Sequence, residues 1–198
     1  MKKTVTIVLV VILAAVVLFC GAGCSKYNSL TRSLQEVESS WSNVETQYQR
    51  RADLIPNLEA TVKGYAQHES STFEAVTEAR AKAGSITISD VDDLNEQTLE
   101  KFQQAQNQLS GALKSLLAVS EAYPELKANE NFMRFQDELA GTENRIQVAR
   151  RDYNEVVRNY NTQMSLFPTN IFAGFFGFQK KPYFQSAAGA EQAPKVSF

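Results

Sequence analysis

The residue types that most often carry catalysis are scarce in this chain of 198 residues. Its one histidine is His68, and no glutamate stands three positions before it, whereas a di-iron carboxylate bundle needs two Glu-x-x-His motifs. The chain after Cys24 has no further cysteine, which excludes a zinc site built on histidine and cysteine. Gly174 and Gly177 lack the lysine and serine of a phosphate-binding loop. We therefore expect a protein that is not an enzyme, with no catalytic residue, metal or cofactor.

An apolar segment at the N-terminus suits membrane chemistry instead. Thr4 to Cys24 comprises 21 residues, and such a helix would be about 31 Å long at roughly 1.5 Å per residue. That length crosses a bilayer core of about 30 Å. Lys2 and Lys3 precede the segment, which predicts a cytoplasmic N-terminus and an exported remainder. We interpret the segment as an uncleaved signal anchor, the single pass of a cell-membrane protein.

Two alternatives for this segment stay open. In the first, the segment is a lipoprotein signal and Cys24 is lipidated, because the small residues Ala22 and Gly23 precede it. Gly21 stands where such a signal normally has leucine. In the second, the segment is a cleaved signal peptide, although its apolar run is longer than the usual ~7–15 residues.

Charged residues in two short blocks are the candidates for a polar or partner-binding surface. Arg50, Arg51 and Asp53 form one block, and Glu143 and Arg145 belong to the other. We expect an inter-helix polar network first and a partner-binding surface second. The formal net charge of −2 is unlike the basic footprint of a nucleic-acid binder, so no nucleic-acid partner is expected.

A third candidate surface is the aromatic, glycine-rich segment FPTNIFAGFFGF, residues 167–178. Exposed to water, such a patch would favour aggregation, so it must pack on the domain, meet a partner or enter the membrane interface. Lys180 and Lys181 follow it and would suit lipid headgroups. The residues expected at the membrane interface are Phe172, Phe175, Phe176 and Phe178.

Two long helices should position these residues. Apolar residues recur with 3, 4, 3, 4 spacing from Tyr27 to Tyr48 and again from Phe132 to Tyr160, which is the stripe of helices packed side by side. The predicted fold is all-α, an antiparallel four-helix bundle with long coiled-coil-like helices behind an N-terminal transmembrane or signal segment. The same stripes would also allow a homo-oligomer.

Turn and cap signals place the predicted helices at about 27–55, 56–83, 93–123 and 130–165. The signals are a break at Pro56, an Asp93–Glu96 capping pair and an N-cap at Asn129. Residues 1–24 would be the anchor or signal, 25–184 the bundle with its Phe-rich C-terminal segment, and 185–198 a disordered tail. Because short connections favour antiparallel neighbours, the Phe-rich segment should lie near the bilayer.

Several blocks of the chain closely resemble the LemA family of bacterial envelope proteins, from about Tyr27 to Phe184. In order, they are YNSL (27–30), RRADLIPNL (50–58), VKGYA (62–66), NQLSGAL (107–113), AYP (122–124), GTENRI (141–146) and FPTNI (167–171). The resemblance implies an N-terminal membrane segment, an antiparallel helical bundle and no established enzymatic activity. It further implies a tie to membranes: one relative acts in magnetosome membrane formation, and members are linked with an envelope-stress membrane metalloprotease. Cys24 departs from the plain membrane helix of many relatives.

The expected function follows from these observations. We expect a membrane-anchored, exported bundle that acts by binding, as a scaffold or adaptor for envelope membrane proteins, with an envelope protease as one such partner. The alternative is a membrane-remodelling or lipid-contacting protein that acts through the anchor and the Phe-rich segment.

Overall fold

The computed structural model describes residues 2–62, 70–88 and 90–185. Within these residues the chain is helical with extended connections and has no β-strand, so the all-α prediction is confirmed. The elements are α1 (Lys2–Val62), α2 (Ser70–Gly84), the 3₁₀ turn η1 (Val91–Asp93), α3 (Glu96–Ser120), α4 (Pro124–Lys127), α5 (Glu130–Ser165) and α6 (Thr169–Phe176).

Helix α1 is continuous over 61 residues and contains Pro56, so the predicted break at Pro56 is wrong. A proline inside a helix cannot donate to the carbonyl four residues earlier, which is normally left without a partner. Here that carbonyl, of Ala52, accepts a hydrogen bond of 3.2 Å from Nε of Arg80 in α2. Ile55 and Leu58, on either side of the proline, are fully buried. The contact from α2 and this burial keep the helix intact.

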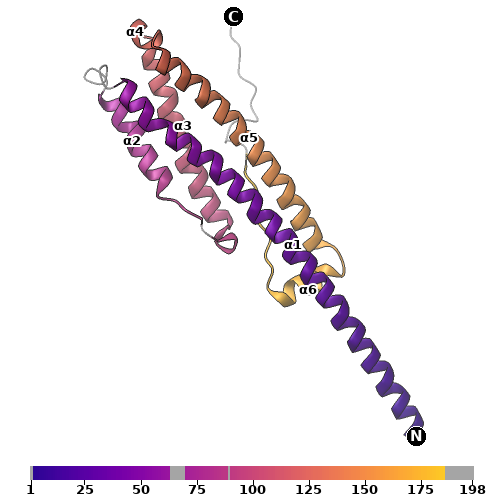
Figure 1. The fold of residues 1–198 in the computed structure, drawn as a ribbon. Coiled ribbons are helices and arrows are strands. Elements are labelled where there is room, and N and C mark those ends of the chain that lie inside the picture. Colours follow the sequence, from indigo (N-terminus) through magenta and orange to yellow (C-terminus); the bar gives the residue numbers. More distant parts are fainter. Residues whose placement is uncertain (1, 63–69, 89, 186–198) are drawn as a thin grey trace, which may run out of the picture.

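Helix α1 packs lengthwise on α5, and α2 packs on α3 (Figure 1). The two apolar stripes meet in the α1–α5 contact, where Val37, Trp41 and Val44 of α1 are buried with Ile146 and Tyr153 of α5. A second core cluster joins the last turns of α1 to α2, α3, α4 and the first turns of α5. The stripe thus predicts most of the inner faces of both long helices. The exceptions are Tyr27, which is exposed, Leu34, which is only partly buried, and Val156, which is partly buried while its neighbour Val157 is fully buried.

The caps agree with the prediction at one helix start and differ at the other. Asn129 caps α5, since its Oδ1 accepts hydrogen bonds from the backbone N–H groups of Asn131 and Phe132 at 2.9 and 3.2 Å. Helix α3 is capped by Asn95 and Thr98, each of which accepts from the other's backbone N–H at 3.0 Å. The predicted Asp93–Glu96 pair is therefore wrong, because Asp93 is taken up by η1.

Both ends of the described chain depart from the helical pairs. The N-terminal part of α1 projects well beyond the other helices (Figure 1), and its large apolar side chains are exposed from Ile7 to Phe19. Within the described residues, this is the helix long and apolar enough to cross a membrane. After α6 the chain turns back and runs extended along α5 as residues 178–185, here called the strap. Of the predicted disordered tail, all but Gln185 lies outside the described residues.

Candidate functional site

Arg51 is the most deeply buried charged residue in the described structure, with 1% of its surface exposed. Its Nη1 donates to Glu143 Oε1 at 2.6 Å and to Ser110 Oγ at 2.7 Å. Its Nη2 donates to the side-chain oxygen of Gln106 and, at 3.2 Å, to the Gln106 carbonyl. One guanidinium therefore ties α1 to both α3 and α5.

The surroundings of Arg51 suit a buried cation. Its guanidinium carbon lies 5.1 Å from the centre of the Tyr48 ring, at the distance of a cation–π contact. Burial raises the pKa of Tyr48, while the nearby charges of Arg150 and Arg51 act in the opposite direction. The phenol therefore stays neutral beside the arginine, and Glu143 supplies the compensating charge that a buried cation requires.

The five predicted charged residues do not form one surface. Arg51 and Glu143 line a cavity of about 520 Å³ between α3 and α5. Arg50 and Asp53 are exposed and line a different cleft of about 730 Å³, bounded by α1, α3 and the end of α2. Arg145 is also exposed and lines a shallow hollow of about 290 Å³ between α1 and α5. The structure brings Arg51 and Glu143 together. Arg50 and Asp53 share a second site, and Arg145 lies in a third.

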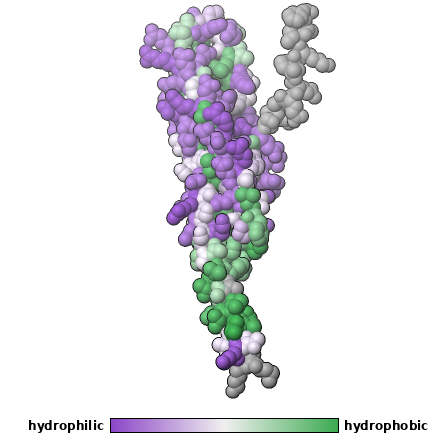
Figure 2. Space-filling view, turned by 90° about the vertical axis from the view of Figure 1, so that its right-hand side faces the viewer, coloured by the Kyte–Doolittle hydropathy of each residue, from purple (hydrophilic) through white to green (hydrophobic). Residues whose placement is uncertain are grey.

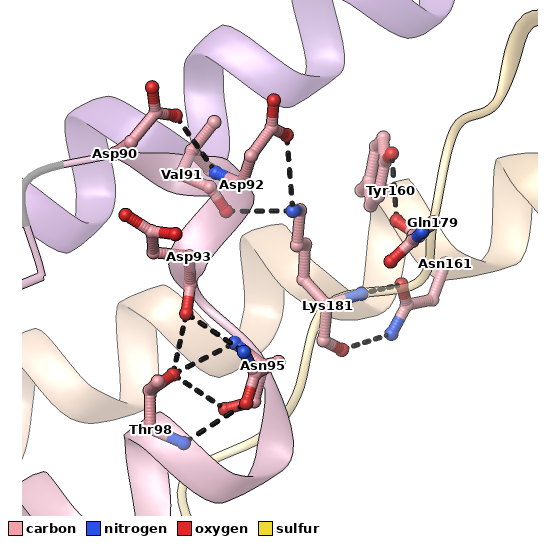
Figure 3. Close-up of polar contacts among 10 residues, drawn as sticks. All are labelled: Asp90, Val91, Asp92, Asp93, Asn95, Thr98, Tyr160, Asn161, Gln179 and Lys181. Atoms are coloured by element: carbon pink, nitrogen blue, oxygen red, sulfur yellow. Dashed lines mark hydrogen bonds and ion pairs between the residues drawn. The ribbon is translucent and has the colours of Figure 1, made fainter.

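The strap is held to α5 by side chains that sequence reasoning missed (Figure 3). Asn161 binds both backbone groups of Lys181: its Nδ2 donates to the carbonyl at 2.8 Å, and its Oδ1 accepts from the N–H at 3.0 Å. The Tyr160 hydroxyl donates to the Gln179 carbonyl at 3.0 Å. Lys181 Nζ in turn donates to the Val91 carbonyl at 2.7 Å and lies 3.6 Å from the Asp92 carboxylate. Lys181 is thus a buried link from the strap to η1 rather than a free cation.

A second clamp of the same kind holds the end of the strap. Asn154 donates to the Phe184 carbonyl at 3.0 Å and accepts from its N–H at 2.8 Å. The Phe184 ring is buried and lies 6.0 Å from Trp41 and 5.2 Å from Tyr153, centre to centre. The Tyr153 hydroxyl donates to the Pro182 carbonyl at 3.0 Å. One sequence signal for these clamps exists, the two asparagines seven residues apart on one face of α5.

Helix α6 lies against α1 just beyond its apolar part. The Phe172 ring is buried 5.0 Å from the Phe19 ring, and Tyr27 contacts Phe176 and Phe178 at 5.0 and 5.7 Å between ring centres. Of the four phenylalanines expected at a membrane interface, Phe172 is buried and Phe178 partly buried, whereas Phe175 and Phe176 are exposed. Leu166, Phe167 and Ile171 are also exposed there, although they are not among those four.

The remaining sequence candidates add no further site. Cys24 is an exposed free thiol on α1. His68 lies outside the described residues. Within the parts of the chain that the structure describes, no three histidine, cysteine, aspartate or glutamate residues are grouped as metal ligands.

These features define an all-α protein in which one membrane-length helix continues into a helical domain closed by a C-terminal strap. The chain belongs to the LemA family, whose profile matches residues 40–198. It is 26% identical over 193 residues to magnetosome protein MamQ 2 of Paramagnetospirillum magneticum, an alignment that covers 89% of this chain and 71% of the relative. It is also 26% identical over 160 residues to protein LemA of Metamycoplasma hominis, covering 81% of this chain and 69% of that protein. The magnetosome protein MamQ of Magnetospirillum gryphiswaldense is 24% identical over 199 residues, with 92% and 73% coverage.

Proposed function

We propose that this protein is a membrane-anchored scaffold or adaptor for membrane proteins of the cell envelope. In this proposal residues 1–24 span the membrane with the N-terminus in the cytoplasm. The rest forms an exported, antiparallel four-helix bundle that binds partners without catalysing a reaction. The observation that carries the proposal is the continuity of α1, which forms both the apolar segment and the first core helix.

A continuous helix fixes the distance and direction of the domain from the membrane. From Lys26 to Val62, α1 extends about 55 Å at roughly 1.5 Å per residue. Sharp bends in helices arise at identifiable defects, and the proline in α1 is compensated by Arg80. Surfaces on the domain would therefore be presented at defined heights above the bilayer, which is what a scaffold requires.

The proposed partner contacts are two separate exposed sites, one with Arg50 and Asp53 on α1 and one with Arg145 on α5. Arg51 and Glu143 are left out of these sites because their contacts are with each other and with α3. The tie to membrane proteins is supported by the MamQ relatives, whose names describe magnetosome proteins. An envelope membrane protease is one candidate partner.

Photo-crosslinking in cells tests the scaffold proposal. Probes at Gln47, Gln136 and Gln179 would sample three parts of the surface, with the cross-linked products identified by mass spectrometry. A reproducible membrane-protein adduct is expected, and it should disappear when Arg50→Glu is combined with Arg145→Glu. The matched control is Arg134→Glu, an exposed cation near the far end of α5. If the double variant keeps its helicity and still cross-links to the membrane protein, neither Arg50 nor Arg145 belongs to the interface.

A second candidate function is contact with lipid, or reshaping of it, through the anchor and the Phe-rich segment. The observation that favours it is the side chain of Phe175, which is 83% exposed on α6, the helix that packs on Phe19 of α1 through Phe172. Cross-links found only to lipid or to other copies of this chain would favour this candidate over the scaffold.

A further inference from the structure

Four large apolar side chains on and just before α6 are more than half exposed. Leu166, Phe167, Ile171 and Phe175 are 58%, 79%, 52% and 83% exposed, respectively. Ile171 and Phe175 are four residues apart in α6 and therefore share one face of the helix, and Phe167 lies two residues before its start. The other face of α6 is already used, because Phe172 and Ala173 are buried against the domain. A contiguous exposed patch of this kind marks an interaction surface.

The place of this patch suggests what covers it. Phe172 packs on Phe19, and its Cε1 would lie 3.1 Å from a Cβ added at Gly23. Helix α6 is therefore fixed to α1 where the exposed apolar run, Ile7 to Phe19, ends. Figure 2 shows hydrophobic surface gathered at this end of the molecule, with hydrophilic surface over the rest. The patch is thus continuous with the part of α1 that would lie in lipid.

The length of α1, measured from Lys3 near its N-terminus, gives the same position for the membrane boundary. Lys3 to Gly23 is a rise of 20 residues, about 30 Å at roughly 1.5 Å per residue. That rise equals the thickness of a bilayer core of about 30 Å. With Lys3 at one headgroup layer, the opposite boundary falls at Gly23, the residue against which Phe172 packs. The end of the apolar run and the length of the helix therefore agree on the boundary next to which α6 lies.

The charges near this level suit phospholipid headgroups. The first acidic residue of α1 is Glu36, whereas Lys26 and Arg32 come earlier. Residues 156–185 include Lys180 and no acidic residue. One carboxylate, of Asp92, comes near through its 3.6 Å contact with Lys181. An apolar face bordered by cations is the arrangement of helices that lie in a membrane interface.

We infer that α6 and the three residues before it form a foot that rests in the outer headgroup region of the bilayer. Leu166, Phe167, Ile171 and Phe175 would contact the acyl chains, while Phe172 holds the foot to α1. The inference rests on the proposed membrane anchoring and deepens it, because a foot beside a single-pass helix fixes both its depth and its rotation. It also replaces Phe172, Phe176 and Phe178 with Leu166, Phe167 and Ile171 among the lipid-contacting residues.

The test uses the full chain in vesicles of phosphatidylcholine and phosphatidylglycerol that carry bromine on their acyl chains. Trp41 is the only native tryptophan and lies about 27 Å above Gly23 at roughly 1.5 Å per residue, so it serves as an internal reference. Phe175→Trp and, separately, Phe167→Trp add an indole to the foot. The matched control is Met133→Trp, which adds an indole at an apolar position 44% exposed at the start of α5. Bromine quenching is expected for the two foot variants, with no quenching of Trp41 or of the control indole.

Three other outcomes would overturn the inference, and each can be distinguished from the others. Vesicles that float with the protein while iodide quenches the foot indoles would leave the anchor in place and remove the foot. If neither iodide nor bromine quenches the foot indoles, the foot is covered by a second copy of the chain and not by lipid. A chain that does not float with the vesicles would remove both the anchor and the foot. Quenching by bromine without any cross-linked protein partner would keep the foot and count against the scaffold.

Discussion

Asn161 binds the backbone of Lys181 on both sides, with its amide donating to the carbonyl at 2.8 Å and accepting from the N–H at 3.0 Å. Asn154 repeats the arrangement on Phe184. Seven residues of α5 separate the asparagines, a rise of about 10.5 Å at roughly 1.5 Å per residue. Three residues separate their partners, about 10 Å of extended chain at roughly 3.3 Å per residue. The two spacings match, so one helix face holds an extended strand in a single register.

Removing one clamp should loosen the strap while the long helices stay folded. Asn161→Leu leaves the N–H and carbonyl of Lys181 without their partner, and an unsatisfied buried group costs about 1–3 kcal/mol. The expected result is a loss of stability of that size in chemical unfolding, with faster hydrogen exchange at the Lys181 amide. Asn159→Leu, at an exposed position of the same helix, is the control and should change stability by less than about 0.5 kcal/mol. Equal effects of the two variants would show that the clamp contributes nothing.

The strap should also loosen at alkaline pH. Burial raises the pKa of Tyr160 from 10.0 to about 12, and the nearby Asp92 charge acts in the same direction. Burial likewise raises the pKa of Tyr153. The folded state therefore binds these protons more tightly than the unfolded state does. Their stabilising effect is complete below pH 10 and is lost as the pH rises from about 10 toward 12.

Tyr160→Phe separates this effect from general alkaline unfolding. The variant should be less stable than the parent at pH 7, by about 0.5–1.5 kcal/mol for the lost hydrogen bond. It should then lose less stability than the parent between pH 10 and 12, because one titrating group has gone. Trp41 fluorescence, which reports on the neighbouring Phe184, can follow both transitions. Tyr183→Phe, at an exposed tyrosine, is the control, and parallel pH curves for Tyr160→Phe and the parent would refute the assignment.

The Arg51–Glu143 ion pair should respond unequally to loss of either partner. The Arg51 side chain is 2% exposed and that of Glu143 is 36% exposed. Glu143→Ala leaves a buried cation without its counter-charge, for which about 3–5 kcal/mol is typical. Arg51→Met leaves a carboxylate that water can reach and a buried side chain of similar length, so its cost should be clearly smaller. Chemical unfolding of both variants gives the comparison.

The double variant, Arg51→Met combined with Glu143→Ala, tests whether the unpaired arginine causes the larger loss of stability. Arg51→Met should recover part of the stability lost in Glu143→Ala, because it removes the unpaired buried charge. Glu130→Ala, at an exposed ion pair with Arg134 on the same helix, should cost about 0–1 kcal/mol. If Arg51→Met proves the more damaging single change, the network is held mainly by the arginine's bonds to α3.

The parts of the fold that the sequence predicts are those encoded locally. The apolar stripe from Phe132 to Tyr160 shows which face of α5 is buried, because the period of a helix is set by the backbone alone. The cap at Asn129 is equally local, since its side chain reaches only the next turn. Both could therefore be predicted without knowledge of neighbouring helices.

The parts that sequence reasoning missed depend on distant contacts. Pro56 remains helical because Arg80, far along the chain, satisfies the Ala52 carbonyl. The strap is recognised mainly through its backbone carbonyl and N–H groups, which leave no pattern in its own side chains. The charged blocks could be picked out as candidates, but which of their members meet depends on helix rotation, and only Arg51 and Glu143 do.

The anchor type can be decided at Cys24. If the segment stays uncleaved, Cys24→Ser should change the mass only by the exchange of one sulfur for one oxygen and should leave the membrane fraction and the detergent requirement of the protein unchanged. Lipoprotein cleavage would remove Phe19 and Gly23, which pack on Phe172. Intact-mass spectrometry of the purified membrane protein is the measurement. The lipid anchor would be established instead if the parent protein lacks residues 1–23 and carries a lipid, and if Cys24→Ser abolishes this modification.

Gly23 should be far more sensitive to substitution than Gly21, one half-turn away on the same helix. A Cβ at Gly23 would lie 3.1 Å from the Phe172 ring, whereas a Cβ at Gly21 meets nothing within 4 Å. Alanine is favoured over glycine inside a helix by about 1 kcal/mol, so Gly21→Ala should be neutral or stabilising. In Gly23→Leu the added side chain displaces Phe172, and α6 should separate from α1. Hydrogen exchange of α6 in a detergent or lipid environment should rise in Gly23→Leu and stay unchanged in Gly21→Leu. Similar exchange in the two leucine variants would mean that the contact between Gly23 and Phe172 does not hold α6 in place.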